Sequence, residues 1–575
     1  MESMILRPSS SMRSTPLPNP SLHSTEPALV RSLAPSKISV SLVLSSLRSH
    51  LLHLLQSLSA RALTPFLQAT STSLRFISLD QETGTLQSLY HVPGTVANRG
   101  EDYIQNPPAD IYVVDALKFY TNLLLKQDLG FAESYLDGYI AFHPPPYPNL
   151  LNACQTSNEG STSTMSTSIA AYEKDVPCLL SILSILIKCR ESGAQLHPFF
   201  VLLNKCYWNS KGLLNSITRV FSGRDTEKKN AAENGAEWRF GWGGGNNTEE
   251  KEGSRRNIEL HYDLGNRLFQ KILGRSWTYS CAMFKEKNDF VEGTGDGVVE
   301  GRTSGMGETD EELQGMEGDE LDRAQWRKLD RIIEKLRLGR HCRVLDIGSG
   351  WGELAIRIAK KYKCTVIGIT LSKEQLELSQ QRAKEHQVQE YVQFLYMDYR
   401  QLPEYVRQHG RFDRIVSVEM LEAVGHQFLS RFFEVIEDTL SQDGLLVLQV
   451  ITTPECRYKN YLHGIDFIQG YIFPGACCPS IDAVLSAAAS GSKLSLEECR
   501  NIGPHYAKTL HEWRNRFLKA VEDGTVEAEG FDQVFIRKWV YYFCYCEAGF
   551  RSRTLGLAQM LFSRPGNTKT LDAFN

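Results

Sequence analysis

The sequence predicts an α/β protein with a doubly wound, mostly parallel sheet and a smaller α+β domain before it. Two observations carry this prediction. From Leu321 onwards, strand-like apolar runs alternate with segments of helical period. A glycine-rich turn, VLDIGSGWG (344–352), stands where the first of these strands meets the next helix. The chain has 575 residues, which is enough for two or more domains.

Composition argues against several classes of protein. The formal net charge is −4, and 42% of residues are hydrophobic, so we expect no nucleic-acid surface. No apolar run is long enough to span a bilayer. The 13 cysteines show no paired CxxC spacing, which favours reduced thiols, no metal centre and a cytoplasmic location.

Composition also suggests where the domains begin and end. Residues 1–35 are rich in Ser and Pro, which predicts a disordered tail, with a mitochondrial leader as the alternative. Residues 36–223 form the expected N-terminal domain, and the charged, Gly-rich residues 224–254 predict a linker. Residues 255–575 form the large domain, and an acidic segment at about 286–320 predicts a disordered insertion within it.

The N-terminal domain contains both strand-like and helix-like patterns of apolar residues. Strands are expected at 73–80 and 85–92, and helices at 111–125 and 176–189. An interrupted apolar run at 39–55 predicts an amphipathic helix, which would bring the protein to a membrane surface without crossing it.

The large domain follows a regular order. Its first helix starts near Leu321, places Trp326, Leu329 and Ile332 on one face, and is expected to stop at Gly339. After it we expect strands at 342–348, 364–371, 391–398, 412–420 and 444–451, and helices from 353, at 373–387 and at 428–440.

The glycine turn has two interpretations. Gly348, Gly350 and Gly352 allow a sharp turn and close approach of a ligand to the backbone. A dinucleotide site is the alternative, but Trp351 stands where a diphosphate needs room, and Thr370 ends the second strand where a ribose-binding carboxylate would be needed. Asp346 before the glycines and Asp-Tyr (398–399) after the third strand favour a class-I methyltransferase that binds S-adenosylmethionine.

The large domain resembles the cyclopropane-fatty-acyl-phospholipid synthase family, in its eukaryotic branch, which is related to the mycolic acid cyclopropane synthases. The resemblance runs from about Arg256 to Asn567. It rests on HYDLGN (261–266), TYSCAMF (278–284), LDIGSGWG, GITLSKEQ (368–375), VEMLEAVG (418–425), YIFPGACCPS (471–480) and YCEAGFRSRTLG (545–556). More weakly, DLGFAESYLDGYIAF (128–142) is similar to the end of a sterol-carrier-like N-terminal domain.

The resemblance implies which residues hold the cofactor and which face the reaction. It makes Tyr279, Ser280, Gly348, Gly350, Thr370, Leu371, Gln375 and Tyr399 cofactor contacts, beside Asp346 and Gly352 of the turn. It also implies a bound bicarbonate as general base, held by Cys281, Glu422, the backbone of Ile451 and Tyr506. Gln449 stands where the family usually has His, and Gln cannot carry a proton. Cys546 matches a family active-site Cys and is interpreted as pocket lining, not as a nucleophile.

Structural interpretations stand beside these functional ones. His261 and Asp263 could cap the helix that follows, and Glu422 could favour a helix start. Glu419 is interpreted as a bystander to Glu422. The aromatic residues Trp539, Tyr541, Tyr542, Phe543 and Tyr545 are either core or the wall of an acyl-chain tunnel.

The expected function is ring formation on a lipid. The predicted enzyme transfers a methylene unit from S-adenosylmethionine to the cis double bond of an unsaturated membrane phospholipid, with peripheral membrane contact and the question of a homodimer left open. Two alternatives remain: a related enzyme that adds a methyl branch, for instance to a sphingolipid, and a non-catalytic lipid-binding protein with a degenerate methyltransferase domain.

Overall fold

The computed structural model describes residues 74–79, 86–92, 109–142, 172, 175–184, 186–187, 265–285 and 318–571. The chain divides into two compact units, residues 1–53 and 54–575, and the first lies outside the described residues. The predicted tail or leader, the amphipathic helix at 39–55, the linker, His261, Asp263 and nearly all of the acidic insertion also lie outside them. The domain boundaries therefore stay predictions.

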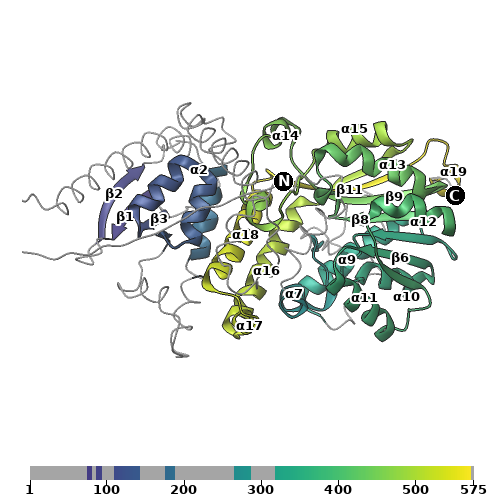
Figure 1. The fold of residues 1–575 in the computed structure, drawn as a ribbon, viewed down its shortest axis with the longest axis horizontal. Helices are drawn as coiled ribbons and strands as arrows, with labels where there is room; N and C mark the ends of the chain where they lie inside the picture. The colour runs from purple at the N-terminus through teal and green to yellow at the C-terminus, as the bar shows by residue number, and fades with distance from the viewer. Residues whose placement is uncertain are drawn as a thin grey trace, which may run out of the picture. The chain divides into compact units, whose positions relative to one another are not determined.

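The N-terminal part contains a small sheet with strand order β2-β1-β3-β4 (Figure 1). Its elements are β1 (Leu74–Leu79), β2 (Leu86–Val92), β3 (Ala109–Val113), α2 (Ala116–Leu136) and β4 (Ile140–Ala141). Strand β1 pairs antiparallel with β2 and parallel with β3. Strands β1 and β2 confirm the two predicted strands.

One predicted element of this part is wrong at its start. Residues 111–113 belong to strand β3 and not to a helix, because the β-branched and aromatic side chains of Ile, Tyr and Val favour a strand. The helix begins only after Asp115, whose carboxylate accepts a hydrogen bond from the backbone of Lys118 at 3.1 Å.

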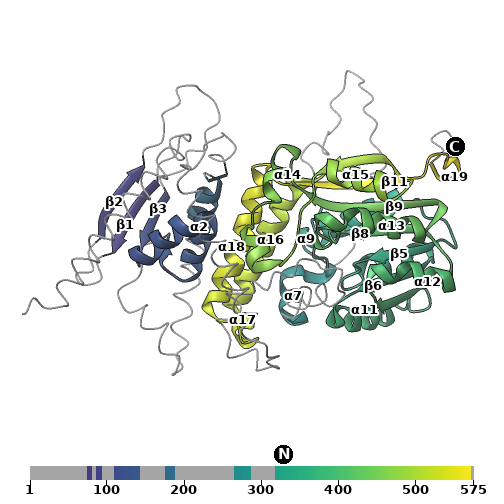
Figure 2. The same cartoon turned by 45° about the horizontal axis from the view of Figure 1, so that its top comes forward.

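The large sheet has seven strands in the order β10-β11-β9-β8-β5-β6-β7 (Figure 2). Strands β5 to β9 run parallel, and β11 is antiparallel to both of its neighbours, β9 and β10. This is the predicted class-I methyltransferase fold, which is confirmed. Its strands are β5 (Arg343–Ile347), β6 (Thr365–Thr370), β7 (Val392–Tyr396), β8 (Phe412–Val418), β9 (Leu440–Thr452), β10 (Ser495–Asn501) and β11 (Gly556–Ser563).

Helices cover both faces of this sheet. Successive side chains of each strand point to opposite faces, so each face has its own hydrophobic core. Val344 and Val447 point into one core, whereas Leu345 and Leu446 point into the other. The helices are α7 (Asn266–Leu273), α9 (Glu320–Leu336), α10 (Glu353–Tyr362), α11 (Lys373–Glu385), α12 (Leu402–His409), α13 (Leu429–Thr439), α14 (Glu455–Tyr461), α15 (Ile481–Gly491), α16 (Gly503–Glu522), α17 (Thr525–Ala528), α18 (Gln533–Arg551) and α19 (Thr568–Leu571).

Helix α9 ends earlier than the sequence predicts. Arg337, not Gly339, adopts the left-handed conformation that stops it, with φ 46°. Within the ranges that the structure covers, no helix has both the length and the apolar character needed to cross a bilayer.

A buried ion pair joins α16 to α18. The guanidinium of Arg514 contacts the carboxylate of Glu547, and both side chains are almost completely inaccessible to solvent. Arg551 reaches the same carboxylate from the exposed side. Beside the pair, the rings of Trp539 and Phe543 pack on Phe517. These helices form one wall of the cavity described below, so the pair fixes the position of that wall.

We predict that Arg514→Met lowers the free energy of unfolding by about 3–5 kcal/mol, the usual cost of leaving one buried charge unpaired. The lower end is expected because Arg551 still faces Glu547. Arg514→Met combined with Glu547→Leu should cost much less, since neither charge is then buried. Urea unfolding followed by circular dichroism measures both. A double variant less stable than the single one would contradict this account.

Candidate functional site

A cavity of about 1100 Å³ opens at the carboxyl edge of the large sheet. The residues that follow five neighbouring parallel strands line it, as expected for a ligand site in an open α/β sheet. These residues are Gly348 and Gly350 after β5, Thr370 and Leu371 at β6, Asp398 and Tyr399 after β7, Glu419 and Glu422 after β8, and Ile451 and Thr453 at β9.

The glycine turn divides into a ligand-facing part and a packing part. Gly350 has φ 54°, and a Cβ there would meet nothing within 4 Å, so the backbone is open to the cavity. A Cβ on Gly352 would instead lie 2.5 Å from the ring of Phe394. Gly352 does not line the cavity; it allows the start of α10 to pack on the sheet.

Asp346 presents an unpaired oxygen to the cavity. The residue is buried, lines the cavity, and has no hydrogen-bond partner at Oδ2. Burial raises the pKa of this carboxyl to about 7, although the nearby amine of Lys328 opposes the shift. The site therefore holds an acceptor that a cationic or donor group of a ligand would satisfy.

The predicted contacts on β6 and β7 line the same cavity. The hydroxyl of Thr370 lies 2.8 Å from Oε1 of Gln375, so the two side chains hold each other in place. The Tyr399 ring packs on Phe432 with centroids 5.5 Å apart, and burial raises the pKa of its hydroxyl to about 12. It therefore presents a neutral aromatic surface to the cavity.

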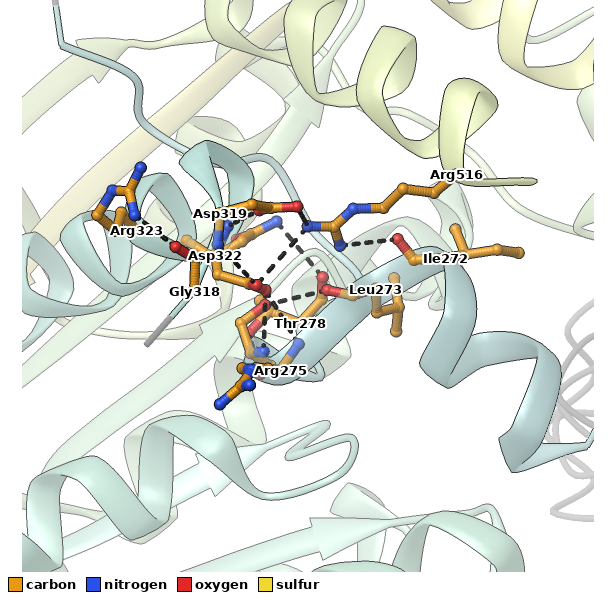
Figure 3. Close-up of polar contacts among 11 residues, drawn as sticks. Ile272, Leu273, Arg275, Thr278, Gly318, Asp319, Asp322, Arg323 and Arg516 are labelled. Carbon is orange, nitrogen blue, oxygen red and sulfur yellow. Dashed lines mark hydrogen bonds and ion pairs between the residues drawn. The ribbon is translucent and has the colours of Figure 1, made fainter. Parts of the chain in front are cut away.

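Charged side chains from two helices bind the backbone of residues 272–276 (Figure 3). Asp322 of α9 accepts hydrogen bonds from the backbone of Arg275 at 3.0 Å and of Ser276 at 3.3 Å. Arg516 of α16 donates to the carbonyl of Ile272 at 3.1 Å and pairs with Asp319. This network positions the Tyr-Ser-Cys stretch that follows.

The end of this stretch is tied to α9 as well. The backbone N–H of Met283 donates to the carbonyl of Ala324 at 3.0 Å, and Arg327 donates to the carbonyl of Met283 at 2.7 Å. The acidic insertion thus leaves and re-enters the domain beside the same helix.

Tyr279 and Ser280 line the cavity. The hydroxyl of Tyr279 lies 3.0 Å from that of Tyr542 on α18. The Ser280 hydroxyl accepts a 2.6 Å hydrogen bond from Lys328, an amine fully buried on α9, and burial lowers the pKa of this amine to about 8. Sequence reasoning missed Lys328. Its position four residues before Ile332, on the apolar face of the helix, was the available signal.

Glu419 accepts hydrogen bonds from three donors. Its Oε1 accepts from the backbone of Cys281 at 2.9 Å and from Nε2 of Gln449 at 2.7 Å, and its Oε2 accepts from the hydroxyl of Tyr506 at 2.6 Å. Burial raises the pKa of this carboxyl, and the hydrogen bonds and Lys328 act against that rise. From the sequence, Glu419 is interpreted as a bystander; in the structure, three predicted site residues donate hydrogen bonds to it.

Glu422 also lines the cavity, but it has fewer hydrogen-bond partners than Glu419. One carboxylate oxygen accepts from the backbone of Ile451, which the resemblance assigns to bicarbonate, and the other has no partner. Burial, followed by repulsion from Glu419, raises the pKa of Glu422 to about 8. At neutral pH a carboxyl with this pKa is mostly protonated, and Glu419 differs from it in accepting three hydrogen bonds.

Two thiols were predicted at this site. Cys281 does not line the cavity: its side chain is fully buried, its Sγ lies 3.2 Å from the carbonyl of Ala282, and its backbone N–H faces Glu419. Cys546 does line the cavity, and burial raises the pKa of its thiol far above the usual range. A protonated thiol is a poor nucleophile.

Aromatic residues of α18 divide between the core and the cavity lining. Trp539 and Phe543 are core residues, whereas Tyr542 and Tyr545 line the cavity. At the cavity rim, the segment after α14 contributes Ile465. Among the described residues, Leu462 and Ile465 are the large hydrophobic side chains that remain exposed, at 36% and 46%.

Comparison with known proteins shows which family the large domain matches. The family model described as mycolic acid cyclopropane synthetase matches residues 249–560. The chain is 37% identical over 316 residues to a tuberculostearic acid methyltransferase of Mycobacterium tuberculosis, covering 55% of this chain. It is 35% identical over 304 residues to the cyclopropane-fatty-acyl-phospholipid synthase of Escherichia coli, covering 53% of this chain. Each alignment spans 66% of the relative's own length.

A solved structure is similar to the chain over the same region. It is the mycolic acid cyclopropane synthase CmaA1 complexed with SAH and CTAB, at 28% identity and a TM-score of 0.44, with 54% of this chain and 98% of that chain covered. The family match extends over more than half of the chain and includes every cavity-lining motif of the large sheet. The chain belongs to the mycolic acid cyclopropane synthetase family.

Proposed function

We propose that this protein transfers a methylene unit from S-adenosylmethionine to the cis double bond of an unsaturated phospholipid acyl chain and so forms a cyclopropane ring. One observation carries the proposal: a single cavity joins the glycine turn to two buried carboxyl groups and several aromatic rings. Family membership supports it, because relatives carry the names of cyclopropane synthases and lipid methyltransferases.

The residues at the glycine turn fit S-adenosylmethionine. Asp346 offers an unpaired, buried acceptor to an ammonium group, and Gly350 leaves the backbone exposed to the ligand. Tyr399 offers an aromatic face suited to adenine. When bound, the cofactor supplies an electrophilic methyl group.

The remainder of the cavity suits a long apolar chain. A volume of about 1100 Å³ exceeds the usual range for one small ligand, about 300–1,000 Å³. Ile468, Phe473, Leu510 and Phe550 add apolar surface to the lining. Such a chamber excludes water, which would otherwise capture a carbocation.

The chemistry assigns distinct tasks to the chain. An alkene needs no base to attack a methyl group, but the resulting cation must be stabilised and must then lose a proton. Tyr279, Tyr542 and Tyr545 place aromatic rings around the cavity, which favours a cation. Glu422, with one free oxygen, is proposed to face the reacting carbons.

The base remains the open part of this proposal. The family resemblance implies a bound bicarbonate, which stays a prediction. Cys281 and Tyr506, which were expected to hold it, donate to Glu419 in this structure, as does Gln449.

A methyl-branching reaction is the second candidate. Gln449 favours it, since it replaces a residue that could carry a proton, and one relative is named as a methyltransferase and not as a cyclopropane synthase. A non-catalytic lipid-binding role is the third candidate, and the unpaired Asp346 and Glu422 oxygens count against it.

Lipid analysis tests the function. Purified protein is incubated with S-adenosylmethionine carrying a labelled methyl group and with vesicles of an unsaturated phospholipid. We expect label in the acyl chains and cyclopropane proton signals by NMR. A labelled product with a methyl branch would favour the second candidate. No labelled lipid, despite cofactor binding, would favour the third.

We predict that cofactor affinity falls as pH decreases from 8 to 6. Asp346 has a pKa of about 7, so below that pH it becomes protonated and no longer attracts an ammonium group. The dissociation constant should rise by up to about tenfold per pH unit below 7. Calorimetry at several pH values measures it, and Asp346→Asn should bind weakly with no such slope. An unchanged slope in that variant would contradict the role of Asp346.

Membrane contact is proposed to be peripheral. The substrate lies in a bilayer, and the exposed Leu462 and Ile465 lie on the segment that forms the cavity rim. Apolar side chains beside such an opening can enter the lipid surface without a membrane span. The predicted amphipathic helix at 39–55 would add to this contact.

We predict that Leu462→Ser with Ile465→Ser lowers turnover of vesicle substrate several-fold, because the rim then inserts less apolar surface. Cofactor affinity should be unchanged, and turnover of the same lipid in detergent micelles should recover. Equal losses in vesicles and in micelles would show that the segment serves the chemistry and not the membrane contact.

A further inference from the structure

We propose that the carboxylate of Glu419 is the general base that removes the final proton, in the place where the family resemblance implies a bound bicarbonate. This inference rests on the proposed function. It makes the base part of the chain and predicts that the reaction needs no dissolved anion.

The contacts of Glu419 are those of an anion-binding site. Backbone N–H of Cys281, amide of Gln449 and hydroxyl of Tyr506 all donate to its two oxygens, at 2.6–2.9 Å. Two of these residues, Cys281 and Tyr506, were expected to hold bicarbonate, which also presents oxygen acceptors, and Gln449 stands where the family usually has His. A side-chain carboxylate already satisfies these donors, so a second anion beside it would meet repulsion and no free donor.

The substitution at Gln449 agrees with this assignment. Its amide donates to Glu419 and its carbonyl oxygen accepts from Gln559 at 2.9 Å. It therefore orients the carboxylate without competing for the proton. A histidine at this position could take up a proton itself, whereas glutamine leaves Glu419 as the acceptor.

Hydrogen bonding separates the two acids of the cavity. Burial raises the pKa of Glu419, whereas its three hydrogen bonds and the buried amine of Lys328 act against that rise. Glu422 has one donor and a free oxygen, and it is the member of the pair that holds a proton at neutral pH. When their environments give two neighbouring acids different pKa values, one can serve as the acid and the other as the base.

The backbone supplies independent support. Glu419 has φ 51°, a conformation that glycine adopts freely and that costs other residues of order 1–3 kcal/mol. Its N–H is held by the carbonyl of Gln449 at 2.7 Å. Strain of this kind persists where the surrounding structure imposes it, and the residue that carries it here lines the cavity.

The step balances without another reactant. After the alkene has gained the methyl group, a C–H bond of that methyl breaks. Its electron pair forms the third side of the ring at the cationic carbon, and its proton goes to an oxygen of Glu419. The protonated carboxyl then returns its proton to solvent before the next turnover.

Glu419→Gly is the informative variant, because glycine relieves the backbone strain and leaves the three donors free. In bicarbonate-free buffer its turnover should fall at least about a hundredfold, the scale of a lost general base. Added bicarbonate should restore a large part of the loss. Glu419→Gln should lose as much without rescue, since the amide still fills the site.

Wild-type turnover should be the same with and without bicarbonate. Wild-type dependence on bicarbonate, or near-full turnover of Glu419→Gly without it, would overturn the assignment. Tyr506→Phe added to Glu419→Gly removes one donor and should weaken the rescue. Calorimetry with S-adenosylmethionine serves as the folding control for each variant.

A binding measurement separates this inference from the proposed function. Titration with ¹³C-labelled bicarbonate, followed by NMR, should show binding to Glu419→Gly and none to the wild type. Bicarbonate bound by the wild type would overturn the inference whether or not any lipid is methylated. Absence of labelled lipid from the wild type would instead count against the proposed function, and the titration would still decide what occupies the site.

Discussion

The cost of burying charge governs the site. Asp346, Glu422 and Lys328 lie at the same cavity with almost no access to solvent, and Glu419 beside them is only partly accessible; an isolated charge there would be unfavourable. Three donors surround Glu419, burial raises the pKa of Glu422 to about 8, and Lys328 donates to Ser280, whereas Asp346 keeps one oxygen without a partner. The neighbouring segments are arranged to make these states compatible.

That arrangement explains why so many hydrogen bonds and ion pairs join the elements of the cavity wall. Donors to Glu419 come from the segment after α7, from β9 and from α16, so each of these elements must hold its position to within hydrogen-bond tolerance. Asp322 and Arg516 fix the first of them, and the Arg514–Glu547 pair fixes the last against α18. Charges away from the cavity thus set the geometry within it.

The sequence predicted the large fold well because each strand and helix carries its own periodicity. It also placed Gly350, Thr370 and Tyr399 at the ligand edge, since topology alone brings the ends of parallel strands together. The environment of Glu419 could not be predicted for a physical reason: its partner Tyr506 lies 87 residues away, and no local pattern records that contact. Lys328 and Cys281 show the same limit, because the face that a side chain presents to a cavity is decided by packing.

The two anchors on α9 have a consequence for how the protein can be engineered. The chain leaves the domain just after Met283, which is held by Ala324 and Arg327, and re-enters at Gly318 directly before the same helix. With both ends tied down, added chain length between Lys285 and Gly318 changes the closure entropy only slowly, by about 0.6 kcal/mol per doubling. A fluorescent protein or an affinity tag inserted between these two anchors is therefore expected to cost little stability, and it would keep a reporter covalently close to the large domain.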